Sequence, residues 1–432
     1  MSIRNRWIWA ALALVAAWAT PAASGAGPGR SVEVAIDAAG DVPVAEIVDR
    51  LARASGISVE RPPAGLSLST RGLSRALARA MLAEALGPGV EVAFRPGWMV
   101  LTIDENRLAS DRQGEWAGRL RDLSARAAEA ARRRENYGMR GRASYRPNDP
   151  GRPTVCLVHG LNSSSGGFVH LIPWLEEAGY GVVVHDYPFN RPIAESCERF
   201  ARDWSAFRKQ AGERRPWAIL AHSMGALLAR SLIEDDATWG GDVSSMILVA
   251  PVNSGSHLAR MQTMIQLMEG LQSIRSKKTA RAMLDLSEGV GEAANDMLPG
   301  SPFLVAMNRR PRRAGVPHHI IAGDVGFLDR EGRARIEARL DLLNRNAGIF
   351  GRLAQVATAD VPALLDELTD GTGDGCVAVD RTRLAGVSDQ VIVHANHAEL
   401  IRAPLLFRDP GPVACMPDAL RWLAADCPRP AR

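Results

Sequence analysis

Ser223 has the surroundings that an enzymatic serine nucleophile needs. It lies in the stretch WAILAHSMG, residues 217–225, where a short apolar run is followed by a turn and a helix start. A serine hydroxyl is a weak nucleophile, so it must be held on a sharp turn where a histidine can take its proton. Ala221 and Gly225, two positions before and after the serine, are small enough for such a turn. The alternative is a buried strand whose last serine caps the next helix.

A second turn supplies candidate hydrogen-bond donors for an oxyanion. The strand predicted at residues 154–158 ends in His159, and Gly160 then allows the backbone to turn so that the N–H of Leu161 faces the developing charge. The N–H of Met224, directly after the serine, is the second predicted donor. Removing one such donor costs roughly 3 to 4 kcal/mol of transition-state stabilisation, so this pair would carry a large share of catalysis.

The predicted acid and base follow later in the chain. Asp374 lies in the glycine-rich turn GDGCV, and His397 follows a predicted strand. The order serine, acid, histidine is that of the α/β-hydrolase arrangement. Asp324, which directly follows another predicted strand, and Asp380 are alternatives to Asp374 as the acid.

Buried strands alternate with helices from residue 154 onward, and they position these side chains. Continuous Val-rich strands separated by helices indicate a parallel sheet that is covered on both faces. Ligand sites in such sheets lie at the carboxyl ends of the strands. His222 and His394 fall within strand patterns, so we expect them to be packed or hydrogen-bonded. The strands are predicted at residues 154–158, 181–188, 218–221, 245–250, 318–322 and 390–394, and the helices at 168–178, 193–210 and 226–234.

About residues 142–430 resemble α/β-hydrolases of the lipase and esterase kind. The resemblance rests on five motifs in the expected order, VHGLN, AHSMG, APVNSGS, GDGCVAV and NHAEL. It implies an α/β fold in which helices cover both faces of a mostly parallel sheet, with Ser223 as nucleophile, His397 as general base and Asp374 as the group that orients it. It implies no metal and no organic cofactor. The predicted reaction is cleavage of carboxylic esters, above all acyl lipids, through an acyl-enzyme.

Two other functions remain open at this point. An acyltransferase or amidase acting on envelope material would use the same triad with another acceptor or leaving group. A non-catalytic protein would keep the hydrolase body and dock a partner through its first domain. Fold alone does not decide among them.

Two stretches interrupt the strand–helix alternation. Residues 257–317 are a predicted cap, and their apolar stripe suits either an adaptable acyl-binding surface or a core-facing helix. Residues 325–370 are a second predicted insertion, and the sequence indicates no role for it. The stripe consists of Met261, Met264, Ile265, Met268 and Leu271.

Residues 1–26 have the pattern of a secretory signal peptide. Arg4 and Arg6 precede an apolar run, and small residues around 19–26 offer a cleavage site. The run is shorter than the about 20 residues of a bilayer span, which favours a cleaved signal peptide. A retained membrane anchor is the alternative. The chain is therefore predicted to be exported, to the periplasm or beyond.

Export permits disulfides, and the chain has 5 cysteines. Cys415 and Cys427 bracket the C-terminal segment and are the predicted pair, whereas Cys156 lies in a strand pattern and is predicted to be a core thiol. The formal charge is only +4, without a long basic face, so nucleic acid is not an expected partner.

Residues 31–104 are predicted to form a small α+β domain. The sequence AEIVDRLARASGISVE, followed by LSLSTRGLSRALARAMLAEAL, resembles the short N-terminal domain of secretins and TonB-dependent receptors. The resemblance implies a periplasmic domain that docks a protein or envelope partner; a generic folding module is the alternative. Its strands are predicted at residues 31–37, 57–60 and 66–69, a hairpin at 90–104, and helices at 44–55 and 74–86.

Residues 105–150 are predicted to be a helical, Arg-rich linker into a hydrolase domain at 151–432. Trp116, Leu120, Leu123 and Ala127 form one helical stripe. The charged remainder is either a solvated face or a face that adheres to an anionic surface.

Overall fold

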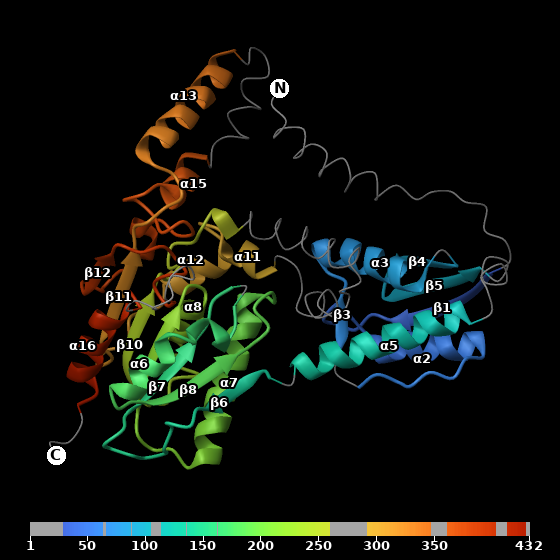
Figure 1. Ribbon diagram of the computed structural model, residues 1–432, viewed down its shortest axis with the longest axis horizontal. Coiled ribbons are helices and arrows are strands. Elements are labelled where there is room, and N and C mark those ends of the chain that lie inside the picture. The colour runs from blue at the N-terminus through green and yellow to red at the C-terminus, as the bar shows by residue number, and fades with distance from the viewer. Residues whose placement is uncertain are drawn as a thin grey trace. The chain divides into compact units, whose positions relative to one another are not determined.

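The computed structural model of the 432-residue chain consists of two compact units (Figure 1). The first unit contains the described residues up to 134, and the second those from 136 onward. None of the helices in the described ranges has the length and apolarity that a bilayer span requires. The predicted signal peptide lies outside those ranges, which are residues 29–63, 66–87, 89–104, 114–134, 136–161, 163–259, 292–346, 361–402 and 413–428.

The first unit is an α+β structure around one apolar core. An antiparallel sheet in the order β1-β5-β4 is joined by a separate β2-β3 pair. Alternate residues of the strands, such as Val32 and Val34, enter the core together with one side of each helix. The elements are β1 (Gly29–Ala35), β2 (Asp41–Pro43), α2 (Val44–Ser55), β3 (Ser67–Ser69), α3 (Gly72–Leu86), β4 (Val90–Arg95), β5 (Trp98–Asp104) and α5 (Glu115–Arg134).

The strand predicted at residues 57–60 is wrong, because this segment is irregular. Helix α2 ends at Gly56, whose φ of 67° is left-handed. The next residues run along α5, where the Ser124 hydroxyl donates to the carbonyl of Glu60. The Glu60 carbonyl is therefore bonded by a side chain, whereas the alternating sequence pattern predicted a bond to a neighbouring strand.

Helix α5 is part of the first unit rather than of a linker. The predicted stripe from Trp116 to Ala127 is buried in the core of that unit. The Trp116 Nε1–H also donates to the Ser55 hydroxyl at 2.9 Å. At the other end of the predicted linker, β6 (Gly138–Gly141) pairs with a strand of the second unit. Residues 105–150 are thus divided between the two units.

The second unit contains a seven-stranded sheet in the order β12-β11-β10-β9-β7-β8-β6. Neighbouring strands are parallel except for β6, which pairs antiparallel with β8 at the edge. This order, with one antiparallel edge strand and helices on both faces, is the predicted α/β-hydrolase fold. The other strands are β7 (Thr154–Val158), β8 (Gly181–Asp186), β9 (Trp217–His222), β10 (Val243–Val249), β11 (His318–Gly323) and β12 (Gln390–Val393).

Each face of this sheet has its own apolar core. Along β9, Ile219 and Ala221 face one side, and Ala218 and Leu220 face the other, because successive side chains of a strand alternate. Both faces are apolar, so the strand reads as a continuous apolar run. The covering helices are α7 (Ile193–Ala211) and α8 (Gly225–Glu234) on one face, and α6 (Leu171–Glu177) and α16 (Met416–Asp426) on the other.

The two predicted insertions carry shorter elements. The stripe of methionines predicted for the cap lies outside the described residues. The described parts contain α11 (Glu292–Asp296) and α12 (Pro302–Asn308) before β11, and α13 (Arg330–Asn346) and α15 (Val361–Leu368) after it.

The predicted disulfide between Cys415 and Cys427 is wrong, since both are free thiols. They flank opposite ends of α16, whose 11 residues rise by about 16 Å. A disulfide requires Cα atoms only about 4.4–6.8 Å apart. Cys156 is a buried thiol of β7, as predicted.

Candidate active site

Ser223 sits on a strained turn between β9 and α8. Its φ is 56°, a left-handed value that costs free energy for a residue with a side chain. Its N–H donates to the carbonyl of Val249 at 2.9 Å, so the turn is fixed to the neighbouring strand. A Cβ on Gly225 would lie 2.5 Å from the carbonyl oxygens of Val158 and His159. Only glycine there allows α8 to start directly against β7, and this geometry defines a nucleophile elbow.

The turn after β7 lies directly against the serine. A Cβ on Gly160 would lie 2.7 Å from the Ser223 Cβ and 3.2 Å from its Oγ, so glycine is needed for this approach. Among the hydrogen bonds between described residues, none has the N–H of Leu161 or Met224 as its donor. Both predicted oxyanion donors are therefore available to a ligand beside Ser223.

His159 fixes the orientation of the oxyanion turn. Its ring is buried and stacks on Tyr187, with centroids 4.3 Å apart. Burial lowers the pKa of His159 to about 4, so the ring is neutral. Its Nδ1–H can then donate to the Gly160 carbonyl at 2.9 Å while Nε2 accepts from the Tyr187 N–H at 3.4 Å. Because C=O and N–H point in opposite directions across a trans peptide, holding this carbonyl also aims the N–H of Leu161.

Asp374 and His397 form a hydrogen-bonded pair in which the carboxylate is fully buried and the imidazole is partly buried. The Nδ1 of His397 lies 2.8 Å from Oδ2 of Asp374, and the backbone N–H of His397 donates to the Asp374 carbonyl at 2.9 Å. The other carboxylate oxygen accepts from the N–H groups of Cys376 and Val377 at 2.9 and 2.7 Å. The pair leaves Nε2 of His397 as the ring nitrogen that can accept a proton.

His222, beside the serine, binds the backbone of His397. Its Nε2–H donates to the His397 carbonyl at 3.0 Å, and the two ring centroids are 4.6 Å apart. Burial, with a smaller contribution from His397, lowers the pKa of His222 well below its ordinary value, so the ring stays neutral. The strand pattern predicted a packed or hydrogen-bonded histidine here, but nothing in the sequence identified its partner. This contact brings His397 next to the elbow.

The alternative acids lie elsewhere. Asp324 bonds to His394, with Oδ1 and Nδ1 3.0 Å apart, and not to His397. Asp380 is exposed and pairs with Arg383 at 3.1 Å. Of the three candidate carboxylates, Asp374 is the one that the structure brings to His397.

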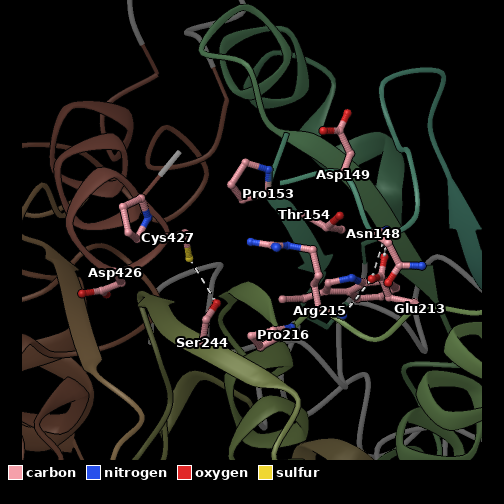
Figure 2. Close-up of a pocket in the computed structure, with 12 residues that line it drawn as sticks. Asn148, Asp149, Pro153, Thr154, Glu213, Arg215, Pro216, Ser244, Asp426 and Cys427 are labelled. Carbon is pink, nitrogen blue, oxygen red and sulfur yellow. Dashed lines mark hydrogen bonds between the residues drawn. The ribbon is translucent and has the colours of Figure 1, made fainter. Parts of the chain in front are cut away.

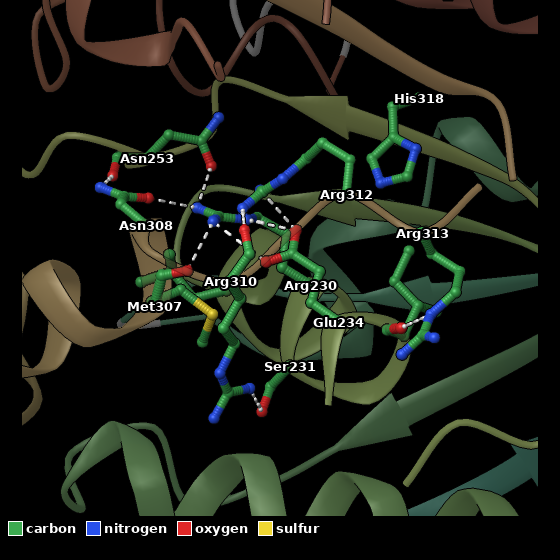
Figure 3. Close-up of polar contacts among 12 residues, drawn as sticks. Arg230, Ser231, Glu234, Asn253, Met307, Asn308, Arg310, Arg312, Arg313 and His318 are labelled. Atoms are coloured by element: carbon green, nitrogen blue, oxygen red, sulfur yellow. Dashed lines mark hydrogen bonds and ion pairs between the residues drawn. The ribbon is translucent and has the colours of Figure 1, made fainter. Parts of the chain in front are cut away.

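The loop after β10, which carries the APVNSGS motif, is anchored by a buried ion-pair network (Figure 3). Arg230 is fully buried and pairs with Glu234 at 2.9 Å. Its guanidinium also donates to the side-chain oxygens of Asn253 and Asn308, at 3.0 Å each. A buried charge needs this many partners, so losing one of them would release the loop. Sequence reasoning singled out the motif but not the arginine that holds it.

Glu367 of α15 ties the same loop to the Asp374 turn. Its carboxylate accepts from the N–H groups of His257 and Leu258 at 2.7 and 2.8 Å, and from the Ser256 hydroxyl at 3.2 Å. The side chain is fully buried, and burial raises the pKa of Glu367 to about 7 against the effect of these donors. Sequence reasoning missed this residue because the second insertion carries no recognisable motif.

A cavity of about 170 Å³ lies at the amino ends of the sheet strands (Figure 2). Thr154, Trp217 and Ser244, which line it, lie at the starts of β7, β9 and β10. Ser223 and His397 instead follow the carboxyl ends of their strands, where parallel sheets bind their ligands. This cavity is therefore not part of the candidate active site.

Potential metal ligands converge at one place in the described part of the chain. Ligand atoms of Asp374, Cys376 and His397 lie within 4.8 Å of one another. This group includes two members of the predicted triad.

A family model and several solved structures are similar to this chain. The family model described as serine aminopeptidase, S33, matches residues 149–296, about a third of the chain. A search of curated proteins returns no match. Among solved structures, the mature lipase BlEst2 of Bacillus licheniformis is 17% identical with a TM-score of 0.40, over 61% of this chain and 92% of that one. Phospholipase PlaB of Legionella pneumophila is 21% identical with a TM-score of 0.31, over 40% of this chain and 39% of that one.

Proposed function

We propose that the protein is an exported serine hydrolase that cleaves carboxylic esters, with acyl lipids as its substrates. The proposal rests on one observation above all. A hydrogen-bonded Asp374–His397 pair lies against an elbow that holds Ser223 at a positive φ, with two available backbone N–H groups beside it. Nucleophile, base, orienting acid and oxyanion donors are the parts that acyl transfer needs.

The geometry suggests how the reaction would run. Asp374 holds the Nδ1–H of His397, so Nε2 is free to accept the proton of Ser223 as its oxygen attacks the ester carbonyl. The N–H groups of Leu161 and Met224 would stabilise the oxyanion. His397 then gives the proton to the leaving alcohol. In the second half of the reaction, His397 takes a proton from water as the water attacks the acyl-enzyme, and it then returns this proton to Ser223.

The preference for esters of acyl lipids is supported by the motifs that resemble lipases and esterases. Amide cleavage is the second candidate, favoured by the match to a family described as a serine aminopeptidase. Both reactions use the same nucleophile and differ in the leaving group. Comparing p-nitrophenyl esters with p-nitroanilides of the same acyl group separates them, because an amidase would turn over the anilides at comparable rates.

Export and partner docking are supported by the first part of the chain. The signal-like pattern at residues 1–26 favours a periplasmic or secreted protein, and the α+β unit is proposed to dock an envelope partner. Fractionation of cells that produce the full chain would test export. Recovery of the protein in the cytoplasm with residues 1–26 still attached would contradict it.

The experiment that tests the proposed reaction is hydrolysis of p-nitrophenyl esters of increasing acyl length. The Ser223→Ala variant should lose activity by several orders of magnitude if the triad acts as a unit. Ser388→Ala, which changes an exposed serine before β12, is the matched control and should retain full activity. A Ser223→Ala protein that folds and still hydrolyses esters at the rate of the unmodified protein would contradict the proposal.

A further inference from the structure

Cys376 places a thiol beside the acid and base of the proposed triad. It lies two residues after Asp374 in the same turn, and its own N–H donates to that carboxylate at 2.9 Å. One ligand atom from each of Asp374, Cys376 and His397 lies within 4.8 Å of the other two. The proposed hydrolysis uses the carboxylate and the imidazole but has no role for the sulfur.

These three groups are a donor set that suits zinc. Zn²⁺ binds thiolate sulfur, imidazole nitrogen and carboxylate oxygen at about 2.0 to 2.3 Å, which places tetrahedral ligands about 3.5 Å apart. The present atoms lie within 4.8 Å of one another, so each pair would need to approach by at most about 1.3 Å. Calcium and magnesium prefer all-oxygen sites, so a site with one sulfur and one nitrogen discriminates against them.

The site can also be reached. The His397 side chain is 16% exposed, and Cys376 is partly buried rather than enclosed. The third ligand, the Asp374 carboxylate, is fully buried. The fourth zinc position would then be left for water.

We propose that Zn²⁺ binds reversibly to Cys376, His397 and Asp374 and thereby switches off the proposed hydrolase. The inference rests on the proposed function for its effect on activity, but not for the binding itself. The geometry points to Nδ1 of His397 as the ligand atom, since this nitrogen faces Asp374.

Binding in this way balances its protons and explains the inhibition. The thiol releases its proton to the solvent when the Zn–S bond forms. A neutral imidazole that binds zinc through Nδ1 carries its single proton on Nε2. Nε2 then becomes a donor and cannot accept the proton of Ser223. The metal also takes the place of the Asp374 hydrogen bond that orients the ring.

The test uses the full chain and Zn²⁺ itself in a buffer that does not bind metals. Competition with a chromogenic chelator measures binding without any reference to catalysis, and it should give one zinc per chain. Ester hydrolysis, expressed for each protein as the ratio of rates with and without zinc, should fall at the same zinc concentrations and return when EDTA is added. In Cys376→Ser, both half-saturation and half-inhibition should move to at least about 10-fold higher zinc.

Cys427→Ser is the matched control, because it changes a thiol at the amino ends of the strands, beside the first residues of β7 and β9. It should bind zinc and respond to it as the unmodified protein does. Equal zinc binding by Cys376→Ser and the unmodified protein would overturn the proposal. So would inhibition that follows zinc binding but is unchanged in Cys376→Ser. A protein that binds one zinc through Cys376 but hydrolyses no ester would refute the proposed function and leave the metal site standing.

Discussion

Two Asp–His pairs lie near the carboxyl end of the same sheet, and they differ mainly in their surroundings. Asp324 follows β11 and bonds to His394 at 3.0 Å, whereas Asp374 bonds to His397 at 2.8 Å. The side chains of the first pair are 25% and 77% exposed, and those of the second are 0% and 16% exposed. Distance alone would not distinguish them.

The difference lies in what holds each carboxylate. Asp374 receives two backbone N–H groups in addition to His397, and the carbonyl of His397 is held by His222. An exposed pair is surrounded by water, which screens the charge and leaves the ring free to move. The buried pair is pre-organised, and pre-organised charge next to a nucleophile is what electrostatic catalysis requires.

The largest expected effect separates the two carboxylates directly. Asp374→Asn should lower kcat for ester hydrolysis by about 10⁴-fold, because an amide no longer holds His397 in the tautomer that accepts the serine proton. Asp324→Asn should stay within about 2-fold, since an exposed pair contributes little. Steady-state kinetics on one p-nitrophenyl ester measures both. Equal losses in the two variants would remove the distinction.

The next effect tests the turn that faces the serine. Gly160→Ala should lower kcat by about 10²- to 10³-fold, as for loss of an oxyanion donor, because the new methyl would lie 2.7 Å from the Ser223 Cβ and push the turn away. Gly118→Ala in α5 is the control, since nothing lies within 4 Å of its added Cβ. Full activity of Gly160→Ala would mean that the turn does not approach the serine.

A smaller effect tests the contact between the two histidines beside the elbow. His222→Phe should lower kcat by about 10-fold with little change in KM, because the His397 carbonyl loses its donor and the ring its support. His222→Gln, which keeps an N–H, should recover part of the loss. His394→Phe, at the exposed pair, should change neither constant. A change in KM alone would indicate substrate contact rather than positioning.

The smallest effect concerns stability, and it depends on the buried carboxyl group of Glu367. Glu367 has its pKa raised to about 7, so its contribution to stability is complete below about pH 4.5 and is lost as pH rises through 7. This contribution is on the order of 3 kcal/mol. Urea unfolding of the unmodified protein minus that of Glu367→Gln, from pH 5 to pH 8, should show this fall.

Buried histidines titrate in the opposite direction, which is why the difference between the two proteins is measured. The pKa values of His159 and His318 are lowered to about 4 by burial, so their contributions are lost as pH falls. They cancel when the two proteins are compared. A difference that does not vary with pH would show that Glu367 does not titrate in this range.

Periodicity and turn residues predicted most of the second unit, because its parallel strands are buried on both faces and separated by well-marked helices. They did not predict β6, whose sequence GMRG has no apolar alternation and which gains its place only by pairing with β8. The strand predicted at residues 57–60 failed for the converse reason. Its pattern is strand-like, but a hydrogen bond joins the segment to α5, more than fifty residues later, and not to a strand.

The candidate site shows the same limit. Motifs selected Ser223, Asp374 and His397 as candidates, and their order in the chain restricted the roles proposed for them. They could not rank Asp374 against Asp324 by geometry, since both follow sheet strands and only the folded turns show which one reaches His397. The bond from His222 to the His397 carbonyl and the position of Glu367 join residues more than one hundred apart in the chain, so no local pattern contains them.

The most direct test of the account is the site and rate of labelling by a fluorophosphonate probe. Peptide mapping by mass spectrometry should find one adduct, on Ser223, which forms rapidly in the unmodified protein and in Asp324→Asn. In Asp374→Asn the same adduct should form orders of magnitude more slowly. An adduct on another residue, no adduct at all, or equal rates in the two aspartate variants would contradict the claim that the buried pair activates Ser223.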